Sequence, residues 1–222
     1  MADRALAPDT PELRERWSGF AFSDDSKSQA ETAIARYPEG RSKSAVMPLL
    51  FIAQRQVGEE TNTQGWLPLP VMEYVARYLD LPVIRVVEVA TFYFMYNLQP
   101  VGKYHVQVCG TTPCMLRGSD AIMATCKARG MAKGAVSEDG LWTLTEVECM
   151  GSCATAPMVQ INDDNYEDLT PERLDTVLDA LAAGERPTTG TQEPGRNTSE
   201  PKTGPTVLRD MVQANHDYRS EW

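Results

Sequence analysis

Four of the five cysteines in this chain fall into two close pairs. Cys109 and Cys114 lie in the stretch VCGTTPCMLRGSD, and Cys149 and Cys153 lie in VECMGSCATAP. Thiols at such short spacing form disulfides, redox dithiols, zinc sites or iron–sulfur sites. The choice among these four chemistries decides most of what the sequence can say about function.

The spacing of each pair disfavours two of the four. Structural zinc sites mostly use C-x2-C knuckles, and the C-x4-C and C-x3-C loops of this chain fit that geometry less well. A thioredoxin-like dithiol uses C-x-x-C, and the sequence contains no such motif. Zinc therefore stays an alternative, whereas a redox dithiol does not.

An iron–sulfur cluster matches the cysteine pattern best. A Rieske centre needs two histidines near the cysteines. The two histidines of this chain are His105 and His216, and His216 lies close to the C-terminus. A [2Fe–2S] cluster held by four thiolates is therefore expected, with the first cysteine pair on one iron and the second pair on the other.

Two further residues of reactive type are expected to have packing roles. Cys126 shares a helical face with Ile122 and Met123, which predicts a buried thiol rather than a metal ligand. His105 precedes Cys109 by four residues on the same expected strand, and hence shares its face. We expect a packed histidine there rather than a residue that tunes a cluster.

Composition and charge exclude several classes of protein. The formal net charge of −10 argues against a nucleic-acid binder and against docking on anionic lipid. No run of about 18 apolar residues is present, so no membrane-spanning helix is expected. Residues 1–17 lack the apolar core of a secretory signal, and no transit peptide is visible. Without export, structural disulfides are disfavoured.

Residues 1–100 are expected to form a helical domain. An amphipathic helix is predicted over 28–36, ending before Pro38. The next helix is expected to begin after Ser44 as N-cap and to end just before Gly58. Two more helices follow in the stretch LPVMEYVARYLDLPVIRVVEVATFYFMYNL, separated at Pro82.

Residues 101–184 change to a mixed pattern. Strands are predicted at 103–108, 142–147 and in PMVQIN, and helices are predicted to end near Gly130 and Gly184. The order β, α, β, β, α indicates a small α/β unit of thioredoxin size. The fold class expected for the whole chain is α+β, with a helical bundle followed by this unit.

Residues 185–222 are expected to form a flexible C-terminal tail. They are rich in Pro, Gly, Thr and charged residues, and such a segment buries too little apolar surface to order itself. The last stretch, TVLRDMVQANHDYRSEW, contains several apolar residues, so a short docking strip on a partner is the alternative.

The chain resembles the 24 kDa-type subunit family of respiratory complex I, the proton-pumping NADH:quinone oxidoreductase. The resemblance is carried by TFYFMYNLQPVGKYHVQVCGTTPCMLRGSD, by VECMGSCATAPMVQIND, and by the earlier GWLPLPVMEYVARYLDLP. It spans roughly residues 20–184, and the two cysteine motifs are its most specific part. The segment after Gly184 lies outside it.

The resemblance implies a helical N-terminal domain followed by a thioredoxin-like [2Fe–2S] ferredoxin domain. It implies cluster ligands at Cys109, Cys114, Cys149 and Cys153, which are the positions that the spacing also selects. It implies a larger partner subunit that binds NADH and FMN, with other subunits of the peripheral arm nearby. The implied location is the cytoplasmic side of a bacterial inner membrane, or the matrix side of a mitochondrial one.

Two alternatives remain open at this point. Related subunits occur in soluble NAD-linked hydrogenases and formate dehydrogenases, and cysteine spacing does not separate them from complex I. A zinc-stabilised module without redox activity is the alternative from another class. The sequence has no G-x-G-x-x-G and no P-loop, so NADH and FMN are expected in a partner and no complete active site is expected in this chain.

Overall fold

The computed structural model describes residues 5–196 together with 199, 201, 203, 206 and 207. The chain divides into two compact units. The first comprises residues 1–106 and 130–145, and the second comprises residues 107–129 and 146–222. The predicted docking strip from 206 onward lies almost wholly outside the described residues. The domain boundaries at 100 and 184 remain a prediction.

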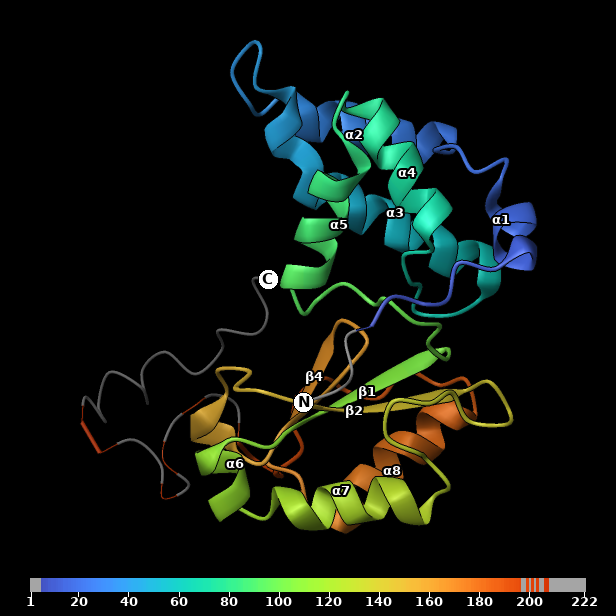
Figure 1. Ribbon diagram of the computed structural model, residues 1–222. Helices are drawn as coiled ribbons and strands as arrows, with labels where there is room; N and C mark the ends of the chain where they lie inside the picture. The colour runs from blue at the N-terminus through green and yellow to red at the C-terminus, as the bar shows by residue number, and fades with distance from the viewer. Residues whose placement is uncertain (1–4, 197–198, 200, 202, 204–205, 208–222) are drawn as a thin grey trace. The chain divides into compact units, whose positions relative to one another are not determined.

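The first unit is mainly helical (Figure 1). Side-chain caps start two of its helices, since the hydroxyls of Thr10 and Ser23 accept hydrogen bonds from the N–H groups of Leu13 and Ser26. The elements in chain order are α1 (Pro11–Trp17), α2 (Asp24–Ile34), the 3₁₀ turn η1 (Ser42–Ala45), α3 (Val46–Thr61), α4 (Leu69–Tyr78) and α5 (Val83–Phe92).

The expected ends of α3 are wrong at both termini. Ser44 lies inside η1 and makes no capping hydrogen bond, and the N-cap of α3 is Ala45. Gly58 lies inside the helix, which ends at Thr61 with Asn62 as a left-handed C-cap. A Cβ on Gly58 would lie 2.8 Å from the Thr63 carbonyl oxygen, so close backbone packing explains this glycine.

The core of the first unit contains an aromatic cluster that joins α4 to the segment between α1 and α2. The rings of Phe20 and Phe22 lie edge to face on Tyr74, with centroids 5.3 and 5.1 Å apart. The Tyr74 hydroxyl accepts a hydrogen bond from the Phe22 N–H at 3.1 Å. Aliphatic side chains of α3, α4 and α5 complete the core, including Leu49, Leu50, Val71, Val75 and Val86.

A mixed sheet has the strand order β2-β1-β3-β4-β5. β3 and β4 pair antiparallel, and β4 and β5 pair parallel. The strands are β1 (Tyr104–Cys109), β2 (Trp142–Val147), β3 (Val159–Ile161), β4 (Asp164–Glu167) and β5 (Gly190–Thr191). The α+β fold class is therefore confirmed, and the three strands that periodicity predicted are all present.

The helices of the second unit are α6 (Thr112–Leu116), α7 (Ser119–Ala128) and α8 (Pro171–Ala182). α7 and α8 lie side by side (Figure 1). Arg129 joins them through ion pairs with Asp175, at 2.7 Å, and with Asp179. Thr170 caps α8 by accepting a hydrogen bond from the Arg173 N–H. The first cysteine pair lies at the end of β1 and in α6, and the second follows β2.

Two strands were not predicted from the sequence. β4 is the polar stretch DNYE, and β5 has only two residues, so neither carries a readable alternation. β5 lies in the segment that was expected to form a flexible tail from residue 185. Residues 190–196 are thus structured where composition indicated no order.

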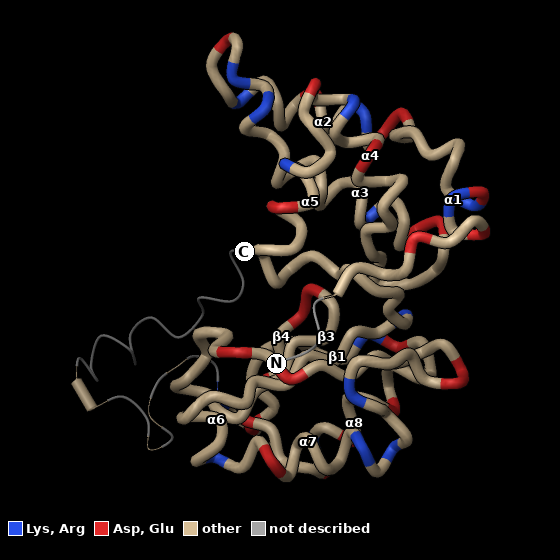
Figure 2. Tube along the Cα trace, viewed as in Figure 1, with Lys and Arg blue, Asp and Glu red and all other residues tan. Residues whose placement is uncertain are grey.

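Charged residues of both signs are interspersed along the described helices and loops of each unit (Figure 2). Neither unit presents a helix lined only by Lys and Arg, in keeping with the acidic net charge. Within the described residues, no helix has the length and apolar character needed to cross a membrane.

Candidate metal centre

The first cysteine pair is buried at the end of β1. Cys109 is the last residue of the strand, and Cys114 lies in the short helix α6 that follows it. Their residues are 2% and 1% exposed. Pro113 stands in the first turn of α6, where a missing N–H carries no cost, and starts the helix directly beside the sulfurs.

The second cysteine pair lies in the loop after β2. Cys149 and Cys153 are both exposed, and their sulfurs are 3.8 Å apart. Neighbouring sulfurs about 2.3 Å from one tetrahedral metal lie about 3.8 Å apart, so this pair is spaced for a shared metal. The five cysteines all lie in the described part of the chain, and all are free thiols.

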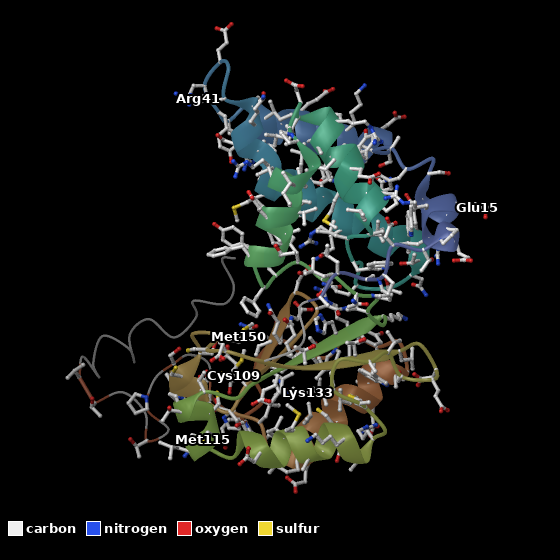
Figure 3. All side chains as sticks on the ribbon, in the orientation of Figure 1. Glu15, Arg41, Cys109, Met115, Lys133 and Met150 are labelled. Carbon is white, nitrogen blue, oxygen red and sulfur yellow. The ribbon has the colours of Figure 1, made fainter. Side chains whose placement is uncertain are left out.

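The two cysteine loops meet inside the second unit. The Met150 N–H, from the second loop, hydrogen-bonds the Cys109 sulfur, and the Met158 N–H hydrogen-bonds the Cys114 sulfur. The Cys109 N–H in turn donates to the Met158 carbonyl at 3.4 Å. Figure 3 shows Cys109 beside Met150. Ala156, Met150 and Met158 close an apolar cluster around the buried pair.

The environment of Cys109 favours its thiolate. Burial is the largest influence on its pKa and raises it, but several hydrogen bonds together outweigh burial and hold the pKa below its ordinary value. The donors are the Thr111 hydroxyl, 3.4 Å from the sulfur, and the N–H groups of Thr111 and Met150. The thiolate is the form of cysteine that binds metals.

The other cysteine sulfurs lie close enough to disfavour one another's thiolate forms. Burial, together with the nearby sulfurs of Cys109 and Cys153, raises the pKa of Cys114 to about 11. The hydrogen bond with Cys149 raises the pKa of Cys153, and the charge on Cys109 adds to the effect. Because three of the sulfurs repel each other as thiolates, a cation among them would relieve that repulsion.

The four sulfurs are arranged as two pairs. In the part of the chain that the structure describes, no group of three or more His, Cys, Asp or Glu side chains is placed to hold one metal ion. Cys109 and Cys114 contact each other, as do Cys149 and Cys153. The described side chains thus place the four candidate ligand sulfurs as two pairs.

Comparison with known proteins identifies the family of this chain. The family model for thioredoxin-like [2Fe-2S] ferredoxins matches residues 30–182. The chain belongs to this family. The E subunit of the NADH-quinone oxidoreductase of Rickettsia bellii is 53% identical over 170 residues, which cover 76% of this chain and 98% of that protein. Its counterpart in Rickettsia conorii is 51% identical with the same coverage.

A solved structure shares the fold of this ferredoxin family member. The crystal structure of an NAD⁺-reducing [NiFe]-hydrogenase in the air-oxidized state superposes with a TM-score of 0.51 at 18% sequence identity. The match covers 63% of this chain and 23% of the hydrogenase chain. At this identity the likeness extends to the fold alone.

Two expectations about other residues of this ferredoxin are confirmed. Cys126 is fully buried, and burial raises the pKa of its thiol to about 12, so it is a core thiol. His105 is 7% exposed, and its Nε2 lies 2.9 Å from the Thr145 hydroxyl oxygen. Both side chains pack in the protein interior, as their positions in the sequence predicted.

Residues that support the second cysteine loop were not predicted from the sequence. The Ser152 and Thr155 hydroxyls donate hydrogen bonds to the Glu167 carboxylate, at 3.1 and 2.6 Å. Glu167 belongs to β4, a strand that carries no readable pattern. The hydrogen bond of Thr111 to the Cys109 sulfur could have been predicted from the sequence. A threonine between two cysteines places a hydroxyl within reach of a thiolate.

Proposed function

We propose that this chain is the [2Fe–2S] electron-transfer subunit of a NADH:quinone oxidoreductase. The observation that carries the proposal is the meeting of two cysteine pairs from separate loops in one compact unit. The matching proteins of two Rickettsia species support it, because the match covers almost their whole length at about half identity.

Cys109 and Cys114 would hold one iron of the cluster, and Cys149 and Cys153 the other. When bound, the cluster supplies one-electron transfer. The N–H groups of Met150 and Met158 donate to the sulfurs and stabilise their negative charge. Burial of the first pair keeps water from one side of the site, whereas the second pair faces the surface.

Hydride chemistry belongs to a partner in this proposal. The sequence carries neither nucleotide-binding motif, so NADH and FMN bind a larger flavoprotein subunit that exchanges single electrons with this chain. Other peripheral-arm subunits complete the assembly. The proposed location is the cytoplasmic face of a bacterial inner membrane, or the matrix face of the mitochondrial one.

Exposed apolar side chains of the first unit suit a protein partner. Ile84, Phe92 and Phe94 are 60%, 73% and 62% exposed on α5 and the turn after it. Exposed aromatic residues that gather on one element mark protein interfaces more often than isolated ones do. We assign this surface to the flavoprotein subunit, the partner that electron exchange requires.

The test is a cysteine variant with a matched control. Cys149→Ser removes one proposed ligand, so the visible absorption and the paramagnetic signal of the reduced protein should be lost or altered. Cys126→Ala changes a cysteine outside the site and should leave both unchanged. Metal and sulfide analysis distinguishes two irons with sulfide from a single zinc. An unaltered signal in Cys149→Ser would show that Cys149 is not a ligand.

A further inference from the structure

The segment after the matched family region returns to the cysteine site. Residues 190–196, which we name the strap, lie beyond residue 182, where the family match ends. The strap begins with β5, which pairs parallel with β4 in the register Tyr166↔Gly190 and Glu167↔Thr191. It lies in the same compact unit as all four candidate ligands.

A turn at residues 193–196 directs the end of the strap back toward the second unit. The Arg196 N–H donates to the Glu193 carbonyl at 3.2 Å, and Gly195 has φ +77°. Pro followed by Gly at the centre of such a turn is the pattern of a type II β-turn, which needs a positive φ at its third residue. The sequence EPGR thus specifies the turn locally, inside a segment whose overall composition indicates disorder.

Arg196 is buried by this turn. Its side chain is 6% exposed, and its Nη1 lies 2.6 Å from Oδ1 of Asp168, whose side chain is 1% exposed. Its Nη2 donates to the carbonyl of Ala154 at 3.0 Å. Ala154 directly follows the candidate ligand Cys153. One guanidinium therefore joins the strap to both β4's end and the second cysteine loop.

Asp168 reinforces the same connection. Its Oδ2 accepts from the Thr191 hydroxyl at 2.7 Å, and its N–H donates to the Thr155 carbonyl at 2.6 Å. Its backbone adopts φ +52°, a left-handed conformation that surrounding contacts must hold in a residue other than glycine. The strap, Asp168 and the 3₁₀ turn that starts at Cys153 are thus linked by consecutive hydrogen bonds.

A second arginine, Arg173, also contacts the strap. Arg173 donates to the Asp168 carbonyl at 2.7 Å and pairs with Glu193 at 2.8 Å. The buried charge of Arg196 is tolerated only when its hydrogen-bonding capacity is satisfied. Its planar guanidinium serves two acceptors, Asp168 and the Ala154 carbonyl, in fixed directions. The position of the Ala154 carbonyl is therefore set by the strap as well as by its own loop.

We propose that Arg196 is a positioning residue that holds the Cys149–Cys153 loop in its ligand geometry. This proposal rests on the proposed function, because the two cysteines are taken as ligands of one iron. Arg196 acts on the loop through the Ala154 carbonyl and through Asp168. The strap makes the second cysteine loop more rigid than its exposure suggests.

The experiment compares Arg196→Met with Arg186→Met in the full chain. Arg186 lies in the same C-terminal segment, is 85% exposed, and reaches Asp164 only at 3.8 Å. Loss of a residue that orients metal ligands costs about 10- to 100-fold in metal affinity, so Arg196→Met should release its cluster to a chelator about tenfold faster than wild type. Arg186→Met should match wild type.

Hydrogen exchange provides a readout that does not depend on the cluster. The N–H of Thr155 donates to Ser152 and that of Asp168 donates to Thr155. These amides should exchange faster in Arg196→Met than in wild type, in the metal-free chain as well. Unchanged exchange of these amides in Arg196→Met, even with a lower unfolding temperature, would reduce Arg196 to a general stabilising residue and overturn the proposal.

Two further variants separate positioning from simple loss of folding. Asp168→Asn with Arg196→Met leaves no unpaired buried charge, so it should restore folding but keep fast exchange in the loop. Arg196→Lys keeps the charge near Asp168 but lacks the fork that also reaches Ala154. Arg196→Lys should recover a larger fraction of the wild-type stability than of the wild-type exchange protection. Equal recovery of both would contradict the proposal.

The experiments give different results if the proposal on Arg196 is wrong and if the proposed function is wrong. If the wild-type chain binds no cluster in any preparation, the proposed function fails. Faster exchange over residues 152–156 in metal-free Arg196→Met would still support the role of the strap. If the wild-type chain holds the cluster but both arginine variants release it at the wild-type rate, only the role of Arg196 fails.

Discussion

His105 is a titratable side chain placed where its charged form is disfavoured. It lies on β1, buried, with its ring beside the Thr145 hydroxyl. Burial lowers its pKa from 6.5 to about 4. The unfolded chain therefore binds a proton at this histidine at a higher pH than the folded chain does, and stability falls as the pH drops from 6.5 towards 4.

We expect this one histidine to cost about 1 kcal/mol of stability between pH 7 and pH 5.5. In His105→Gln that part of the pH dependence should disappear, since glutamine keeps a polar contact with Thr145 but binds no proton. Denaturant unfolding of both proteins at the two pH values measures the difference. Equal losses of stability in the two proteins would mean that His105 is not the group responsible.

Gly65 lies in the middle of the loop between α3 and α4. It has φ +85°, and a Cβ there would lie 2.0 Å from the Gln54 carbonyl oxygen. Its own carbonyl accepts a hydrogen bond from the Asn97 amide, and Asn97's N–H donates to the Gln54 side chain. The close approach of the loop to α3 thus requires a residue without a side chain.

Gly65→Ala should destabilise the protein by about 3 kcal/mol or more, from the strained backbone and the collision together. The comparison is Gly19→Ala, since Gly19 has open space around its Cβ position and no positive φ. That change should shift stability by less than about 0.5 kcal/mol. Thermal and denaturant unfolding provide the two values, and similar stabilities for both variants would contradict the geometry.

At the scale of the molecule, the helical unit exposes apolar side chains that its own core does not use. The proposed function assigns this surface to a flavoprotein partner. Phe92→Ser combined with Phe94→Ser should weaken co-purification with that partner about tenfold or more, because buried aromatic residues dominate interface energies. The cluster signal should not change, since these residues belong to the other compact unit.

The control for this variant is Val136→Ser, which changes an apolar residue of the same unit that is 39% exposed and lies away from α5 in sequence. It should leave co-purification unchanged. If the double phenylalanine variant also binds its partner at the wild-type level, the partner contacts a different surface.

The sequence by itself indicated the candidate ligands and the kind of centre that they suit. Four thiols in two loops, each following an alternating stretch, identify the candidate ligands because ligand type and spacing are local properties of the chain. Periodicity likewise predicted β1, β2, β3 and the core helices, because burial of one face produces a regular spacing of apolar residues in the sequence. Cys126 and His105 were placed in the interior on the same grounds.

Only the tertiary structure decided which residues of the chain contact each other around the site. The Met150 N–H at the Cys109 sulfur, the Glu167 carboxylate under the second loop and the burial of Arg196 all join residues distant in sequence. Backbone donors and short polar strands leave no periodic signal, and a charged residue in a Pro- and Gly-rich segment looks solvated until the fold supplies its buried counter-ion. The sequence thus names the candidate ligands, and the fold decides what holds them in place.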